Sequence, residues 1–166
     1  MNTRALFKPV KVFVFDVDGV LTNGTLLVTE EGHLLRTMNI KDGYALQLAI
    51  KKGYQIWIIS GGTSNAVVKR LSKLGLEEVH IAVKDKAQLL KELLAKYSID
   101  PAALLYMGDD MPDTAVMQMC GLKACPADAI NEIKAIADYI SPIKGGEGCV
   151  RAVSYTHLTL PTNREV

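Results

Sequence analysis

Cysteine is scarce in this sequence, which argues against a disulfide-stabilised fold. The chain has three cysteines, an odd number, and no CxxC pair. Small secreted domains that depend on disulfides carry a denser and even-numbered set. We therefore expect Cys120, Cys125 and Cys149 to be reduced, partly buried thiols in a cytoplasmic protein.

Long hydrophobic runs and an excess of charge of one sign are also missing. The apolar run near the N-terminus is interrupted by Pro9, Lys11 and Asp16 and lacks the shape of a signal peptide. No later run approaches the roughly 18 apolar residues of a membrane span. The 19 basic and 18 acidic residues give a formal net charge of +1. The sequence therefore predicts neither a nucleic-acid partner nor a membrane partner.

Linkers, internal repeats and low-complexity segments are absent too. The 166 residues suffice for one domain with a sizeable core. The end of the chain, SYTHLTLPTNREV, has no helical stripe and contains Pro161. We predict a single domain over residues 1–153 and a non-native or disordered tail over residues 154–166.

Apolar runs of strand length alternate with segments of helical periodicity. This order predicts an α/β fold, a three-layer Rossmann-like parallel sheet with helices on both faces. Residues 25–29 and 33–39, around a glycine turn, predict a projecting β-hairpin. The predicted strands are residues 10–15, 55–59, 79–82, 104–107, 122–125 and 139–140, and the predicted helices are residues 43–52, 64–74, 86–97, 114–120 and 129–137.

Polar residues follow four of the predicted strands. Ligands of an open parallel sheet bind beyond the carboxyl ends of its strands, so we expect these side chains to meet at one edge. They occur in the stretches VFVFDVDGVLT, IISGGTSN, AVKDKAQ and YMGDDMPD. The candidates are Asp16, Asp18, Ser60, Lys86, Asp109, Asp110 and Asp113.

These residue types suit phosphoryl transfer. Clustered carboxylates need a cation, and oxygen ligands favour Mg²⁺. A lysine supplies positive charge for a phosphoryl group, and the Ser60 hydroxyl with the backbone N–H groups of Gly61 and Gly62 can hold phosphate oxygens. One carboxylate can attack phosphorus, while another protonates the leaving alkoxide and later deprotonates water.

Other interpretations of the same residues fit less well. A calcium loop of the EF-hand type would need acidic residues where Val20 and Leu27 stand. A phosphate-accepting receiver domain would need an aspartate after the strand that precedes Ser60. Taken singly, Ser60 fits a helix cap and Lys86 a solvated helix position. Their shared placement at strand ends favours the phosphoryl-transfer site.

Four motifs resemble those of the haloacid dehalogenase-like phosphatases: DVDGVLT, SGG, the lysine of VKDK, and GDDMPD. The resemblance extends from residue 10 to residue 153. The stretches FDVDGVLTNGTL, NIKDGYALQLAIKKGY, IISGGTS and IKGGEGCVR are most similar to its capless branch acting on sugar-acid phosphates, such as 3-deoxy-D-manno-octulosonate 8-phosphate.

The resemblance implies a role for each motif residue. Asp16 would be the nucleophile and Asp18 the general acid and base. Asp16, the backbone carbonyl of Asp18, and Asp109 would hold Mg²⁺. Ser60 and Lys86 would bind the transferring phosphoryl group.

The resemblance also implies that Asp113 supports the metal or the lysine, and it leaves the role of Asp110 open. Pro112 replaces the asparagine usual in the family, and a proline is well tolerated in the first turn of a helix. The family continues past the GGxG segment into a helix and tail, where this chain has its atypical end.

A cap domain does not fit between the motifs, since each gap holds about one helix and one strand. A neighbouring subunit could close the site instead, and the resemblance implies a homotetramer with sites at subunit borders. The hairpin could alternatively pack on its own domain. We expect Arg70, with Lys69, to contact a substrate carboxylate, and Arg151 either to do the same or to cap local structure.

The sequence thus predicts a cytoplasmic, Mg²⁺-dependent phosphatase of 3-deoxy-D-manno-octulosonate 8-phosphate in lipopolysaccharide precursor synthesis. A nine-carbon sialate-type 9-phosphate is the alternative substrate, but that branch often has an acidic residue where this chain has Gly62. A non-catalytic oligomerisation domain is the alternative of another class, and the intact pair Asp16 and Asp18 argues against it.

Overall fold

The structure of the protein, a computed structural model, describes residues 2–158. Its centre is a six-stranded sheet in the order β5-β4-β1-β6-β7-β8, in which every neighbouring pair is parallel. The strands are β1 (Val12–Phe15), β4 (Gln55–Ile59), β5 (Glu78–His80), β6 (Leu104–Met107), β7 (Leu122–Cys125) and β8 (Tyr139–Ile140). The central position of β1 places the residues that follow it in the middle of the carboxyl edge.

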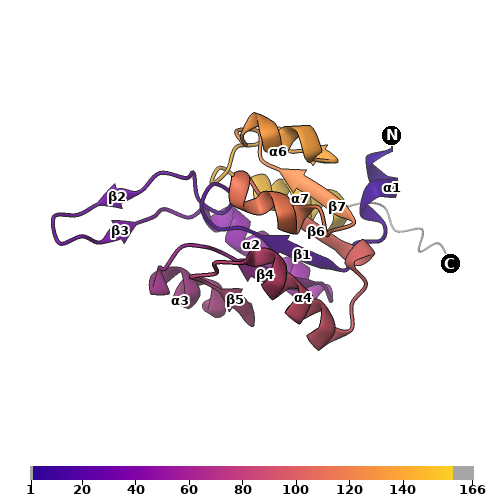
Figure 1. The fold of residues 1–166 in the computed structure, drawn as a ribbon, viewed down its shortest axis with the longest axis horizontal. Helices are drawn as coiled ribbons and strands as arrows, with labels where there is room; N and C mark the ends of the chain where they lie inside the picture. Colours follow the sequence, from indigo (N-terminus) through magenta and orange to yellow (C-terminus); the bar gives the residue numbers. More distant parts are fainter. Residues whose placement is uncertain (1, 159–166) are drawn as a thin grey trace.

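Helices cover both faces of this sheet (Figure 1). They are α1 (Thr3–Phe7), α2 (Ile40–Lys51), α3 (Asn65–Lys73), α4 (Lys86–Tyr97), α5 (Thr114–Met117), α6 (Asn131–Ile136) and α7 (Cys149–Leu158), with 3-10 turns η1 (Pro101–Ala103) and η2 (Met111–Asp113). Side chains of β1 alternate between two cores: Phe13 and Phe15 join α1, α2, α3 and α7, whereas Val12 and Val14 join α4, α5 and α6. The predicted three-layer fold is confirmed.

The helix α2 begins earlier than the sequence pattern indicated. Its first residue is Ile40, three positions before the predicted start. The Asn39 side chain accepts hydrogen bonds from the backbone N–H groups of Lys41 and Asp42, which is a helix cap that periodicity does not detect. This start places Asp42 in the first turn, where it is buried.

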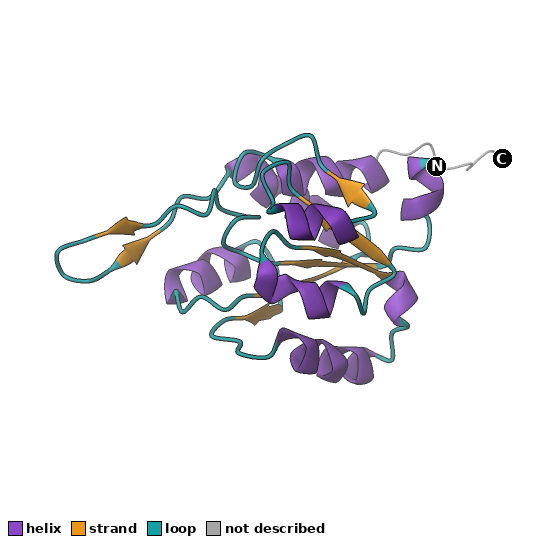
Figure 2. Ribbon diagram, turned by 45° about the horizontal axis from the view of Figure 1, so that its top comes forward, coloured by secondary structure: helices purple, strands orange, loops and turns teal. Residues whose placement is uncertain are grey.

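A β-hairpin projects from the body of the molecule between β1 and α2 (Figures 1 and 2). Its strands, β2 (Leu27–Val28) and β3 (Leu34–Leu35), are antiparallel and shorter than predicted. All four of these apolar residues are exposed, Leu27 to 66%. The hairpin prediction is confirmed, and within residues 2–158 no inserted cap domain accompanies it.

The last described helix differs from the predicted disordered tail. Residues 154–158 form the second half of α7, because α7 packs along α2 and buries Val150 and Val153. Residues 159–166 lie outside the described residues, and a non-native origin of the tail stays a prediction. All three cysteines are buried free thiols. Of the described helices, none has both the length and the apolar character that crossing a membrane requires.

Candidate active site

Of the side chains predicted to meet at the carboxyl edge of the sheet, all except the buried Asp113 line one open cleft of about 310 Å³. The cleft lies over the ends of β1, β4 and β6, so the parallel order of these strands brings distant sequence segments together. Its lining residues are Asp16, Asp18, Gly24, Ser60, Gly61, Gly62, Lys86, Asp109, Asp110 and Pro112.

Asp16 is the first residue after β1, and its side chain is 10% exposed. The backbone N–H of Val17 donates to its Oδ1 at 2.7 Å, and the Lys86 Nζ lies 3.1 Å from the same oxygen. Burial, followed by the nearby Asp113 carboxylate, raises the pKa of Asp16 well above its ordinary value, and Lys86 opposes this rise. The lysine thus favours the ionised form that a nucleophile needs.

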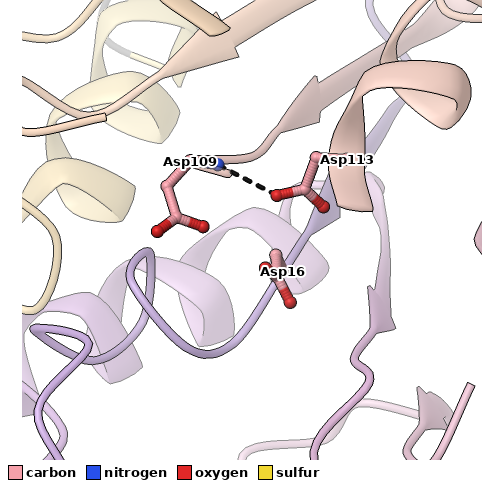
Figure 3. Close-up of side chains that lie close together, drawn as sticks. All are labelled: Asp16, Asp109 and Asp113. Atoms are coloured by element: carbon pink, nitrogen blue, oxygen red, sulfur yellow. Dashed lines mark hydrogen bonds between the residues drawn. The ribbon is translucent and has the colours of Figure 1, made fainter. Parts of the chain in front are cut away.

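Asp109 follows β6 and faces Asp16, as Figure 3 shows. One carboxylate oxygen from each of Asp16, Asp109 and Asp113 lies within 4.8 Å of the others. Burial, then the charges of Asp113 and Asp110, raises the pKa of Asp109 to about 7. The Asp109 Oδ1 is buried without a hydrogen-bond partner. An orphaned carboxylate oxygen in such a cluster fits a hard divalent cation.

Asp113 is fully buried and organises its neighbours by accepting four hydrogen bonds. Its Oδ1 accepts from the Lys86 Nζ at 2.8 Å and from the Tyr106 hydroxyl at 2.8 Å. Its Oδ2 accepts from the backbone N–H of Asp109 at 3.0 Å, drawn in Figure 3, and from that of Asp110 at 3.4 Å. Sequence reasoning missed Tyr106, because it stands inside an apolar run that reads as core.

Lys86 is the first residue of α4 and is 7% exposed. Burial works against its charge, but the carboxylates of Asp16 and Asp113 outweigh burial and raise the pKa of Lys86. The ammonium is therefore held between the carboxylates of Asp16, just after β1, and Asp113, at the end of η2, at the wall of the cleft. This geometry differs from that of a solvated helix lysine.

Asp18 lines the same cleft, and its side chain is 37% exposed. It forms a two-pronged ion pair with Arg36, in which Nε donates to Oδ1 at 2.6 Å and Nη2 donates to Oδ2 at 3.2 Å. Sequence reasoning missed Arg36. No local signal marks it, because its contact depends on how the hairpin returns to the sheet.

The SGG segment after β4 also lines the cleft. Ser60 is buried, and its Oγ accepts from the backbone N–H of Gly62 at 3.1 Å. A side chain on Gly62 would meet the Asp18 carboxylate at 3.1 Å and the Ser60 hydroxyl at 3.3 Å. The absence of one leaves the cleft open to a ligand between these groups.

The glycine-rich loop of residues 143–148 packs against the loop that follows β1. A side chain on Gly145 would collide with the backbone carbonyl of Gly19, so the two backbones are in direct contact. Gly19 has φ of +88°, and any side chain there would collide with the Asp109 carboxylate. The close approach of these glycines fixes the loop that carries Asp18.

The two predicted substrate-binding arginines lie outside the cleft lining. A Cβ on Gly43 of α2 would lie 2.8 Å from the Arg70 Nη2, so the guanidinium packs over α2. The Arg151 guanidinium lies over the Tyr155 ring at 4.4 Å, while its backbone N–H donates to the Asp42 Oδ1. Their contact with substrate stays a prediction, and within this chain they are not part of the cleft.

Comparison with known proteins agrees with this arrangement. The model of the haloacid dehalogenase-like hydrolase family matches residues 78–153. The 3-deoxy-D-manno-octulosonate 8-phosphate phosphatase of Escherichia coli (strain B / BL21-DE3) is 34% identical over 152 residues, which are 92% of this chain and 81% of that protein.

Solved structures of such phosphatases share the whole fold. The phosphatase from Yersinia pestis superposes with a TM-score of 0.90 at 32% identity, covering 93% of this chain and 84% of that chain. The phosphatase from Moraxella catarrhalis, whose structure contains magnesium, phosphate and KDO, superposes with a TM-score of 0.90 at 29% identity. The match covers 95% of this chain and 92% of that chain. The resemblance of the motifs is confirmed: the chain belongs to the haloacid dehalogenase-like hydrolases, in the family of the 3-deoxy-D-manno-octulosonate 8-phosphate phosphatases.

Proposed function

We propose that this protein hydrolyses 3-deoxy-D-manno-octulosonate 8-phosphate to the free sugar acid and inorganic phosphate, with Mg²⁺ as cofactor. The observation that carries the proposal is the grouping of Asp16, Asp109 and Lys86 at one cleft. The family of the chain supports the substrate. The free sugar acid would serve lipopolysaccharide precursor synthesis.

Asp16 would act as the nucleophile. Its carboxylate oxygen forms a bond to phosphorus while the bond between phosphorus and the sugar oxygen breaks, which gives an aspartyl phosphate. The Lys86 ammonium, 3.1 Å from the Asp16 Oδ1, would also attract the oxygens of the incoming phosphate. The Ser60 hydroxyl and the backbone N–H groups of Gly61 and Gly62 would orient those oxygens.

Asp18 would move the protons. In the first step its carboxylic acid gives a proton to the departing sugar oxygen. In the second step its carboxylate takes a proton from the water that attacks the phosphorus. The bond between phosphorus and the Asp16 oxygen breaks, so the Asp16 carboxylate is regenerated and inorganic phosphate is released. Its place on the cleft wall and its partial exposure support this role.

Asp16, the backbone carbonyl of Asp18, and Asp109 would hold the Mg²⁺ ion. When bound, the ion supplies positive charge that offsets the charge on the phosphate oxygens. The unpartnered Asp109 Oδ1 supports this ligand set. Asp113 would support it indirectly, by holding Lys86 and the backbone of Asp109.

The decisive experiment measures phosphate release from 3-deoxy-D-manno-octulosonate 8-phosphate in the presence of Mg²⁺. We expect release by the intact protein and none after addition of EDTA or in the Asp16→Asn variant. A nine-carbon sialate-type 9-phosphate serves as the competing substrate, and a higher kcat/KM for it would reassign the substrate. An intact, folded protein that hydrolyses neither phosphate would support the alternative of a non-catalytic oligomerisation domain.

The exposed hairpin supports self-association. Leu27, Val28, Leu34 and Leu35 present apolar surface to solvent at the tip of the molecule, and such patches mark interaction sites. We propose a homotetramer in which contacts between hairpins join the subunits. Each cleft would then be completed by a neighbouring subunit, whose Arg70 or Arg151 would contact the substrate. Sedimentation should show that Leu27→Asp dissociates the assembly while His33→Asp, on the same hairpin, does not. A fully active wild-type monomer would refute shared sites.

A further inference from the structure

Arg36 stands at the base of the hairpin, one residue after β3. Its side chain is only 8% exposed, although it belongs to a projecting segment. The Arg36 Nη1 donates to the backbone carbonyl of Leu34 at 3.1 Å, which fixes the guanidinium to the hairpin backbone. The remaining edge of the guanidinium faces Asp18.

The contact with Asp18 restricts the carboxylate in both position and plane. Two N–H groups of one rigid guanidinium meet the two carboxylate oxygens, and this fork geometry is more selective than a single bond. Each carboxylate oxygen has a second lone pair, so Asp18 can engage Arg36 and still face the cleft. Arg36 thus fixes the carboxylate through both of its oxygens.

Two other interpretations of the pair fit less well. An exposed ion pair adds little to stability, but this guanidinium is nearly buried and its partner lines the cleft. Direct binding of substrate by Arg36 is disfavoured, because Arg36 is absent from the lining of the cleft. Both guanidinium N–H groups that point towards Asp18 are already engaged by its carboxylate oxygens.

We propose that Arg36 is a positioning residue that aims Asp18 at the sugar oxygen of the substrate. This inference rests on the proposed function, in which Asp18 gives its proton to that oxygen as its bond to phosphorus breaks and the bond from Asp16 forms. Through the hydrogen bond to Leu34, the aim of Asp18 depends on the geometry of the hairpin.

The test compares two leaving groups. An alkyl alkoxide, as in the sugar phosphate, needs a proton from Asp18, whereas 4-nitrophenolate leaves without one. The ratio kcat/KM includes only steps up to formation of the aspartyl phosphate, so it isolates the proton donation. General acid catalysis contributes about 10²–10⁴-fold, and we expect Arg36→Met to lower kcat/KM for the alkyl substrate by about tenfold or more. For 4-nitrophenyl phosphate we expect little change.

The comparison variants separate positioning from structural damage. Asp18→Asn should show the same selectivity for the leaving group with a larger loss, and Arg36→Lys should recover part of the alkyl activity. Arg4→Met, an exposed arginine on α1, should behave as the wild type. Circular dichroism and sedimentation check the fold and assembly. If Arg36→Met does not fold, the test is decided by Arg36→Lys, from its loss in kcat/KM for the alkyl substrate relative to its loss for 4-nitrophenyl phosphate.

The outcomes distinguish this inference from the proposed function. Equal losses for both substrates in the Arg36 variants, or no loss in either, would overturn the positioning role while leaving the phosphatase intact. Equal losses in Asp18→Asn would remove the proton-donor role of Asp18 and the inference with it. A wild-type protein that releases no phosphate from either substrate would refute the proposed function itself.

Discussion

Replacing Asp113 by alanine tests how much of the fold depends on the charge network under the cleft. The carboxylate is completely buried and accepts hydrogen bonds from Lys86, Tyr106 and two backbone N–H groups. Alanine removes all four acceptor contacts and leaves the buried ammonium facing Asp16 alone. Breaking a buried ion pair by deleting one partner typically costs about 3–5 kcal/mol of unfolding free energy.

One effect works in the opposite direction. The Asp113 charge raises the pKa of both Asp16 and Asp109, so its removal relieves repulsion among the three carboxylates. We therefore expect the low end of the range, about 3 kcal/mol for Asp113→Ala. Asp113→Asn keeps one oxygen as an acceptor and should cost less, about 2 kcal/mol, since a hydrogen bond to a charged group contributes about 1.5–3 kcal/mol.

Urea unfolding at a fixed protein concentration, with EDTA present, measures these free energies. The matched control is Asp138→Ala, because Asp138 pairs with Lys123 at 3.1 Å but is 35% exposed. Exposed pairs contribute about 0–1 kcal/mol, so this variant should stay close to the wild type. If Asp113→Ala destabilises the protein no more than Asp138→Ala does, the network under the cleft does not stabilise the fold.

Three further changes give distinct signatures. Burial raises the pKa of Asp42 from 3.8 to about 6, so between these two pH values the folded protein binds more protons than the unfolded chain. Stability should therefore fall as the pH rises from about 4 to about 6, and urea midpoints of Asp42→Asn should lack this fall. Burial and neighbouring carboxylates raise the pKa of Asp109 to about 7, so Mg²⁺ binding should strengthen as the pH rises towards 7 and should release protons. Calorimetry in two buffers detects this proton release, and equal heats of binding in the two buffers would contradict it. A side chain in Gly145→Ala forces the backbone of Gly19 to move, so the free energy of unfolding should fall by about 1–3 kcal/mol and kcat should also fall. Lys144→Ala, at the neighbouring exposed position, should match the wild type.

The sequence predicts the architecture and most of the cleft because both depend on local patterns. An apolar run followed by Asp16 or Asp109 marks a strand end, and parallel strands bring their ends to one edge. Lys86 follows from the same rule. Each of these positions is recognisable from its immediate neighbours in the chain.

The residues that sequence reasoning missed act through long-range contacts. Tyr106 looks like any core residue of β6, and only packing reveals that its hydroxyl meets Asp113. Arg36 looks like a surface residue of a hairpin until that hairpin folds back on Asp18. The position of Arg70 on the helix after SGG predicts a contact with substrate, but a helix position does not determine the direction of a side chain, and the Arg70 guanidinium packs over α2.

The contact between the first loop and the last helix has a consequence for how the protein is made. The Cys149 Sγ donates to the carbonyl oxygen of Val20 across a separation of 129 positions, beside the bond from the Gly146 N–H to the same oxygen. Contacts of such separation form late and slow folding. A nascent chain still held on the ribosome before Cys149 emerges would therefore display its aspartates without a finished cleft. Catalytic activity would then require synthesis of the chain beyond Cys149, and proteolytic cleavage between β8 and α7 would abolish activity.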